Sequence, residues 1–107
     1  MSTLSTHVLD TALGRPAQGV RIELERDGEM LGSGTTDADG RVRDFRSGSL
    51  GEGNYRLTFH VGEYFAAANR ASFYTTIAID FRIGTGSEHY HVPLLLSPFG
   101  YATYRGS

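Results

Sequence analysis

The sequence predicts an all-β protein, an antiparallel β-sandwich with one short helix, formed by a single domain over residues 1–107. Apolar and polar residues alternate with a period of two through several segments, which is the pattern of half-buried strands. Turn signals that contain glycine separate these segments, and one stretch lacks the alternation. Many short strands with one helix indicate two packed antiparallel sheets.

Three predicted strands have the clearest alternation. In residues 20–25, Val20, Ile22 and Leu24 alternate with charged residues, and the same pattern recurs in residues 55–61 and 76–83. Weaker alternation predicts further strands at residues 5–9, 30–36, 41–45, 89–96 and 101–105. Between the strands we expect turns at residues 14–16, 27–28, 39–40, 48–53 and 84–86.

Residues 62–71 are predicted to form the helix. The segment reads GEYFAAANRA, with three consecutive alanines and no alternation. Alanine has the highest helix propensity, so a short helix between two strands is the expected structure.

The strand predicted at residues 89–96 breaks the alternation at Leu94, Leu95 and Leu96, so apolar side chains point to both of its faces. Either both faces are covered within the monomer, or one face meets another subunit. Pro93 has no N–H to donate, which indicates an edge or a bulge at that position. With no helix layer to cover the strand, the pattern favours a subunit contact.

The composition excludes several kinds of chemistry. The chain has no cysteine, so disulfides, zinc–thiolate sites and thiol nucleophiles are absent, and it has no lysine to form a Schiff base. Its net charge is −2 without a basic run, so nucleic acid is not an expected partner. No secretory leader and no apolar stretch of about 20 residues is visible, so we expect a soluble cytoplasmic protein with no membrane partner.

The histidines are the main candidates for chemistry. His89 and His91 lie two residues apart, so on a strand both side chains point to the same face. Two imidazoles on one face can bind a metal ion, or can share acid–base work near neutral pH. A metal would need a further ligand, which His7 supplies only if its strand is a neighbour, and the one flanking carboxylate, Glu88, faces the other way. We therefore predict no metal, and we interpret His60 as a structural residue.

The segment TDADGR, residues 36–41, is predicted to be a tight Asp–Gly turn. A calcium loop that started at Asp37 would need a ligand, a glycine and a glutamate where Arg41, Val42 and Gly48 stand. The turn instead fixes Arg41 at the start of a strand, where a rigid guanidinium can pair with an anion or a planar set of carbonyls.

The chain ends in YRGS, and the alternation continues through residues 101–105. This predicts a last strand that reaches almost to the terminus and brings Tyr104, Arg105 and Ser107 together with the terminal carboxylate. Motifs for a nucleophile elbow, a phosphate-binding loop or a dinucleotide site are missing. Water activated by histidine is then the simplest nucleophile.

The motifs LSTHVLD, TDADGR and HYHVPLLLSPFGYATYRGS, in this order and at these separations, resemble the 5-hydroxyisourate hydrolase family, the transthyretin-related enzymes of urate breakdown. The resemblance runs from about residue 4 to residue 107, and the C-terminal block is its most specific part. It implies a transthyretin-like sandwich, a homotetramer built as a dimer of dimers with active sites where dimers meet, and no cofactor.

The resemblance also implies the reaction and the residues. The implied substrate is 5-hydroxyisourate, and the expected reaction is histidine-assisted attack of water on a ring amide carbonyl to give 2-oxo-4-hydroxy-4-carboxy-5-ureidoimidazoline. The implied catalytic residues are His7, Arg41, His91 and Ser107, and the implied substrate-binding residues are His89, Tyr104, Arg105 and Gly106.

The chain departs from the family pattern at Phe99, Ala102 and Thr75, and none of these is an implied catalytic residue. Two other functions stay open at this point. One is a transthyretin-like carrier of small hydrophobic ligands, against which the histidines and the YRGS ending argue. The other is a non-enzymatic sandwich that binds a metal through His7, His89 and His91.

Overall fold

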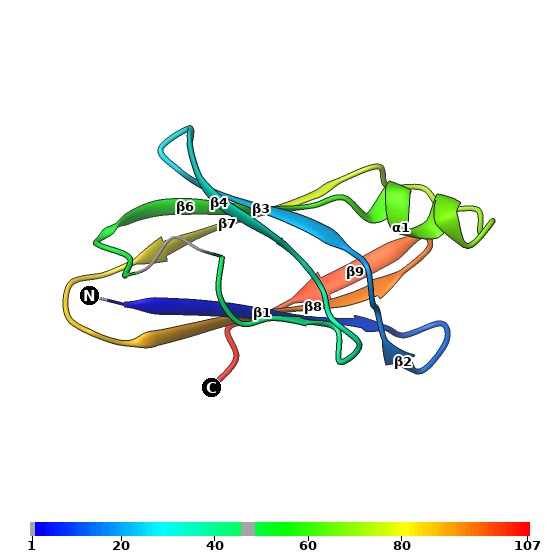
Figure 1. The fold of residues 1–107 in the computed structure, drawn as a ribbon, viewed down its shortest axis with the longest axis horizontal. Helices are drawn as coiled ribbons and strands as arrows, with labels where there is room; N and C mark the ends of the chain where they lie inside the picture. Colours follow the sequence, from blue (N-terminus) through cyan, green and yellow to red (C-terminus); the bar gives the residue numbers. More distant parts are fainter. Residues whose placement is uncertain (1, 46–48) are drawn as a thin grey trace.

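Two β-sheets packed face to face form the protein, with one helix among the described residues (Figure 1). This computed structural model describes residues 2–45 and 49–107. The predicted sandwich is confirmed. The helix, α1 (Val61–Ala67), lies at the end opposite the start of β1 (Thr3–Asp10), as Figure 1 shows.

Over the described residues the first sheet has five strands and the second has four. The order in the first is β2 (Arg15–Pro16), β1, β8 (His89–Ser97) and β9 (Gly100–Thr103), and β5 (Arg41–Val42) also pairs with β1. The order in the second is β4 (Glu29–Thr35), β3 (Arg21–Arg26), β6 (Gly53–Phe59) and β7 (Ile77–Ile83).

The pairing of β1 with β8 is parallel, an exception to the expected antiparallel arrangement. Its register runs from Thr3 opposite His89 to Asp10 opposite Leu96. Parallel neighbours need a long crossover, and here the whole second sheet lies between the two strands in chain order. The other strand pairs in the described ranges are antiparallel. The parallel register decides which side chains meet on the outer face of the first sheet.

The core lies between the two sheets and uses the inward half of each alternating pattern. Fully buried side chains of the second sheet, such as Ile22 and Leu57, face Val8 and Leu94 of the first. Full burial of one such side chain stabilises the fold by about 1.5–3 kcal/mol. Because the inward positions are filled in this way, the residues between them must face outward.

The Leu94–Leu96 run belongs to an interior strand. Leu94 and Leu96 are fully buried in the core, whereas Leu95 is half-buried on the outer face. The edge character predicted at Pro93 is local, because the pairing with β9 begins only at Leu94. The Pro93 carbonyl instead accepts a hydrogen bond from the Thr103 hydroxyl, at 2.7 Å.

Three elements are shorter than the sequence predicts. The helix ends at Ala67 rather than at residue 71, and Asn69 adopts a left-handed conformation with φ of 56°. The predicted strand at residues 41–45 is reduced to β5, and the last strand stops at Thr103. The turn predicted at residues 48–53 lies partly outside the described residues. In the described ranges, no helix has the length and apolar character that crossing a membrane would require.

A buried ion pair joins the end of β1 to the segment after α1. The Asp10 side chain has no exposed surface and accepts hydrogen bonds from Arg70 at 2.7 Å and from the Tyr64 hydroxyl at 2.7 Å. Burial alone would raise the pKa of Asp10, but the hydrogen bonds from Arg70 and Tyr64 outweigh it, so the pKa is lowered. The contact ties the segment after α1 to the end of β1.

We expect Asp10→Ala to lower the free energy of unfolding by about 3–5 kcal/mol, because it strands the Arg70 guanidinium without its partner. Glu63→Ala is the matched control, since Glu63 pairs with Arg21 on the surface, where such pairs contribute about 0–1 kcal/mol. Urea denaturation of both variants measures the difference. Equal losses of stability in the two variants would contradict a special role for the buried pair.

The lowered pKa of Asp10 also gives the contact a pH dependence. A carboxyl group with a depressed folded-state pKa stabilises the fold above its unfolded pKa of about 3.9 and loses that effect as the pH falls through its folded value. The stability difference between wild type and Asp10→Ala should therefore shrink only in strongly acidic solution.

Candidate active site

The outer face of the first sheet collects the predicted histidines. On β1 the inward residues include Thr6 and Val8, both fully buried, so Ser5 and His7 point outward. On β8, His89 and His91 point outward in the same way. The parallel register sets Ser5 opposite His91 and His7 opposite Pro93. His7 and His91 therefore lie on neighbouring strands of one face, although they are far apart in the sequence.

The Asp–Gly turn before β5 is built by its own side chains. The Asp37 carboxylate accepts hydrogen bonds from the backbone N–H of Asp39 at 2.9 Å and of Arg41 at 3.0 Å. Gly40 has φ of +74°, and a Cβ at this position would lie 2.4 Å from the Val8 carbonyl oxygen, so only glycine fits. The N–H of Val8 donates to the Gly40 carbonyl at 2.7 Å, which docks the turn on β1.

This docking places Arg41 beside His7, because β5 pairs with β1 in the register His7 opposite Arg41. Arg41 from β5, His7 from β1 and His91 from β8 thus come from three adjacent strands. A cation next to two imidazoles has a direct electrostatic consequence for both.

Both imidazoles are held toward the neutral form. Burial lowers the pKa of His7, and the positive charge of Arg41 lowers it further, against a hydrogen bond with the backbone of Asp39. Burial also lowers the pKa of His91, and the charges of Arg41, His7 and His89 add to this. At neutral pH the site therefore holds two neutral histidines, each able to accept a proton.

The C-terminal tail returns to this face at Gly106. After β9 ends, the N–H of Gly106 donates to the His91 carbonyl at 2.8 Å, and the two residues form an isolated β-bridge. A Cβ on Gly106 would lie 2.5 Å from Cδ2 of the His91 ring, so the absence of a side chain lets the tail pass over the imidazole. Ser107 follows directly and is exposed.

The side chains of Arg105 and Tyr104 lie away from the outer-face histidines. The Arg105 guanidinium pairs with Glu88 at 3.1 Å and stacks 4.5 Å from the ring centre of Tyr90, an inward-facing residue of β8. Tyr104 is 58% exposed. Within this chain, the structure does not bring these two side chains onto the histidines.

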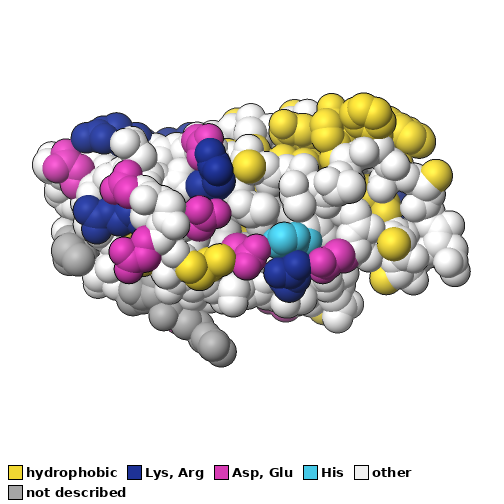
Figure 2. Space-filling view, turned by 90° about the horizontal axis from the view of Figure 1, so that it is seen from above, with side chains coloured by type: hydrophobic (Ala, Val, Ile, Leu, Met, Phe, Trp, Pro, Cys, Tyr) yellow, Lys and Arg dark blue, Asp and Glu magenta, His cyan; other side chains and the backbone are white. Residues whose placement is uncertain are grey.

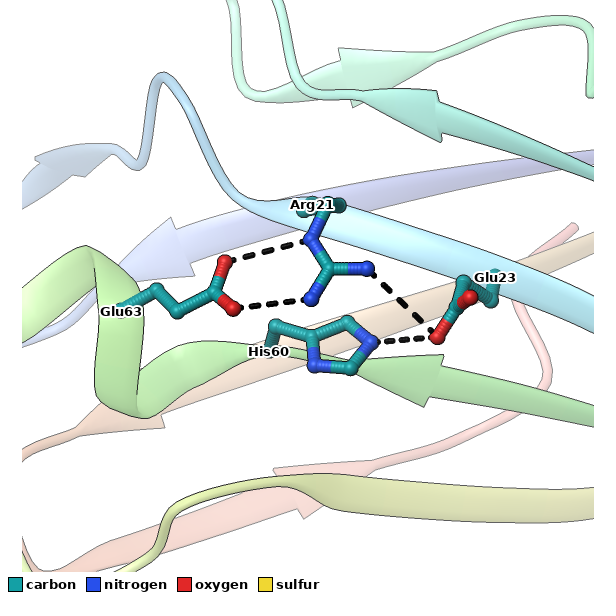
Figure 3. Close-up of polar contacts among 4 residues, drawn as sticks. All are labelled: Arg21, Glu23, His60 and Glu63. Atoms are coloured by element: carbon teal, nitrogen blue, oxygen red, sulfur yellow. Dashed lines mark hydrogen bonds and ion pairs between the residues drawn. The ribbon is translucent and has the colours of Figure 1, made fainter.

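His60 lies on the opposite side of the sandwich, in a cluster of charged residues. It contacts the carboxylate of Glu23 on β3, while the guanidinium of Arg21 pairs with Glu63 at 2.8 Å and with Glu23 at 3.7 Å (Figure 3). The contacts tie the start of α1 to β3. This is the structural role expected for His60.

The sequence leaves open a metal site formed by His7, His89 and His91, and the geometry does not support such a site. Among the residues that the structure describes, no group of three or more histidine, aspartate or glutamate side chains is placed to hold a metal ion.

The sequence reasoning missed two hydroxyl residues, Thr3 and Ser5. Both contact the histidines of β8: Thr3 Oγ1 lies 2.6 Å from Nδ1 of His89, and Ser5 Oγ lies 2.8 Å from Nδ1 of His91. A signal was present, because Thr3, Ser5 and His7 are spaced two residues apart and must share one face once β1 is a strand.

The fold and the outer-face histidines define a class of protein: the chain belongs to the HIUase/Transthyretin family, whose model matches residues 4–106. The resemblance stated from the motifs is thereby confirmed.

Individual relatives are similar over the whole chain. The 5-hydroxyisourate hydrolase of Caulobacter vibrioides is 46% identical over 115 residues, with 100% of each chain covered. The structure of the Klebsiella pneumoniae 5-hydroxyisourate hydrolase superimposes with a TM-score of 0.93 at 48% identity, again with 100% of each chain covered. Sea bream transthyretin in complex with thyroxine gives a TM-score of 0.89 at 28% identity and covers 97% of this chain and 94% of its own.

We expect Arg41→Gln to raise the pKa of both His7 and His91, because removal of the cation relieves one of the two main causes that disfavour the imidazolium forms. NMR titration of the histidine ring protons measures the two values. In the wild type both should titrate below about 6.5, the ordinary value for histidine.

The control is Arg82→Gln, which removes a positive charge from β7 in the other sheet. It should leave both titrations unchanged. An Arg41→Gln protein with unshifted His7 and His91 would show that Arg41 does not act on them.

Proposed function

We propose that the protein hydrolyses 5-hydroxyisourate to 2-oxo-4-hydroxy-4-carboxy-5-ureidoimidazoline, by histidine-assisted attack of water on a ring amide carbonyl. The observation that carries this proposal is the meeting of two imidazoles, His7 and His91, with Arg41 on one face, where burial and the charge of Arg41 lower the pKa of both rings. The names of the relatives that match the whole chain support the choice of substrate.

The chemistry needs a base, an acid and a site for negative charge. Water adds its oxygen to the ring carbonyl carbon while one imidazole accepts its proton. The carbon–nitrogen bond then breaks, and a proton passes to the departing ring nitrogen, so that a carboxylate and an N–H remain. His7 and His91 form the acid–base pair, without an assignment of which acts first as base.

Arg41 stabilises the negative charge that develops on the carbonyl oxygen. One well-placed donor contributes about 3 kcal/mol to such a transition state. A guanidinium also presents a planar fork of N–H groups, which matches the several carbonyls of an oxidised purine. The docked turn before β5 holds Arg41 in advance, which avoids reorganisation during the reaction.

The C-terminal residues complete the proposed site. Gly106 carries the tail over the His91 ring, and the proposed role of the Ser107 hydroxyl is to orient water or substrate. Tyr104 has the same proposed role in the assembled protein, since within its own chain its side chain is exposed away from the histidines. His89 and Arg105 are the remaining proposed binding residues. Since Arg105 turns to Glu88 and Tyr90 within its own chain, its part in binding is proposed for the assembled protein.

We expect the purified protein to accelerate the decay of freshly generated 5-hydroxyisourate, followed by ultraviolet absorbance. His91→Asn should lower kcat by roughly 10²- to 10⁴-fold, the usual contribution of a general acid or base, because an amide does not accept a proton at neutral pH. His60→Asn makes the same change on the opposite sheet and should keep wild-type turnover.

Full activity of His91→Asn would exclude His91 from the chemistry. If the wild type instead binds small hydrophobic ligands and does not accelerate the decay, the carrier function takes precedence, in line with the likeness to sea bream transthyretin.

We also propose a homotetramer, a dimer of dimers. β7 and β9 end their sheets on one side, where exposed strand edges can pair with another copy. Phe73 and Phe99 are 72% and 69% exposed near this side, and Tyr74 contacts Tyr101 of β9. Figure 2 shows hydrophobic side chains gathered in a strip toward the α1 end of the molecule. Such exposed patches are typical of subunit contacts.

Phe73→Asp should reduce the assembly to a smaller species without unfolding the chain, because the side chain contributes little to the monomer core. Light scattering after size-exclusion chromatography gives the molar mass. Met30→Asp is the control, since Met30 is also exposed but lies on β4 at the far edge of its sheet. A wild-type protein that is monomeric at working concentration would refute the assembly.

A further inference from the structure

Four side chains of β1 and β8 form a continuous hydrogen-bonded chain on the outer face. Thr3 Oγ1 lies 2.6 Å from Nδ1 of His89, and Nε2 of the same ring lies 2.9 Å from Ser5 Oγ. Ser5 Oγ in turn lies 2.8 Å from Nδ1 of His91. The two strands contribute alternately, which follows from the parallel register of Thr3 with His89 and of Ser5 with His91.

Ser5 is the central link because it contacts both imidazoles. A serine hydroxyl has one proton to donate, and its oxygen also accepts. When both rings are neutral, Ser5 must donate to one ring nitrogen and accept an N–H from the other. The protonated nitrogen of His91 therefore depends on that of His89, and the two tautomers are set together through this hydroxyl.

The proposed function selects one of the two arrangements. Nδ1 of His91 is engaged by the Ser5 hydroxyl at 2.8 Å, so Nε2 is the ring nitrogen left to accept a proton from water. For Nε2 to be unprotonated in the neutral ring, Nδ1 must carry the proton and donate it to the Ser5 oxygen. The Ser5 hydroxyl then donates to Nε2 of His89, and the His89 Nδ1–H donates to Thr3. This order leaves Nε2 of His91 with its lone pair free.

The rest of the His91 ring is fixed by the tail. Gly106 passes so close to Cδ2 that a Cβ there would lie only 2.5 Å away. Ser5 holds the Nδ1 side of the ring while Gly106 covers the Cδ2 edge. A ring held on both sides presents Nε2 in one direction, which is the condition for efficient proton transfer.

We propose that Ser5 is a positioning residue of the active site, whose hydroxyl holds His91 as the Nδ1–H tautomer and so keeps Nε2 available as the proton acceptor. This inference rests on the proposed function for its effect on turnover. The tautomer itself is a property of the resting protein and is measurable without substrate.

The experiment compares wild type, Ser5→Ala, Ser5→Thr and the control Ser33→Ala, which removes an exposed hydroxyl from β4 in the other sheet. Long-range proton–nitrogen NMR correlations of the histidine rings, recorded near pH 8, report which nitrogen of His91 is protonated. The decay of 5-hydroxyisourate gives kcat and KM for each protein.

The proposal expects His91 as Nδ1–H in the wild type and a gain of the Nε2–H form in Ser5→Ala. It expects kcat of Ser5→Ala to fall by at least about tenfold, with a smaller change in KM, since the group that performs acid–base catalysis worth roughly 10²–10⁴-fold stays present but misdirected. Ser5→Thr restores the hydroxyl and should restore both readouts, and Ser33→Ala should match the wild type.

An Nε2–H tautomer in the wild type would overturn the proposal, whether or not the variants fold. So would a Ser5→Ala protein with an unchanged tautomer, or one with wild-type kcat. If the wild type shows the Nδ1–H tautomer but no enzyme form accelerates the decay, the proposed function fails while the assignment of Ser5 to His91 stands.

Discussion

The parallel pairing of β1 with β8 is the constraint on which the outer face depends. Ser5 and His91 are 86 positions apart in the chain, and only this register sets them opposite one another. A shift of the register by one residue would reverse the facing of a whole strand. Such a shift would expose Val8 and bury His7. The free-energy cost of exposing Val8 therefore keeps the strand in the register that positions the histidines.

The partial burial of the candidate site results from its position on the outer face of the same sheet. Its side chains lie on the outer face and are only partly buried, so His7 and His91 lose enough hydration to favour their neutral forms while water can still reach them. The charge of Arg41 acts in the same direction. In the interior, by contrast, the buried carboxylate of Asp10 is paired with Arg70 and accepts a hydrogen bond from Tyr64.

Local sequence patterns predict much of this fold, but they do not predict the contacts between distant segments. The strands β3, β6 and β7 follow from period two, and so does the shared face of His89 and His91. The position of Arg41 beside His7 depends on the pairing of β5 with β1, two segments far apart in the chain, and the sequence has no local signal for this pairing. The helix ends early at a left-handed Asn69, and the following Arg70 pairs with Asp10 across 60 positions. The sequence pattern could have identified Thr3 and Ser5, since they precede His7 at intervals of two residues and so lie on its face.

The close passage of Gly106 over the His91 ring has a practical meaning for anyone who handles this protein. The carboxyl end of a chain is commonly where a purification handle or a fusion partner is attached, because it is taken to be remote from anything important. Here the final peptide unit emerges one residue beyond a contact with an imidazole. Any extension beyond Ser107 would start beside the outer-face histidines, so the end of this sequence adjoins the candidate site.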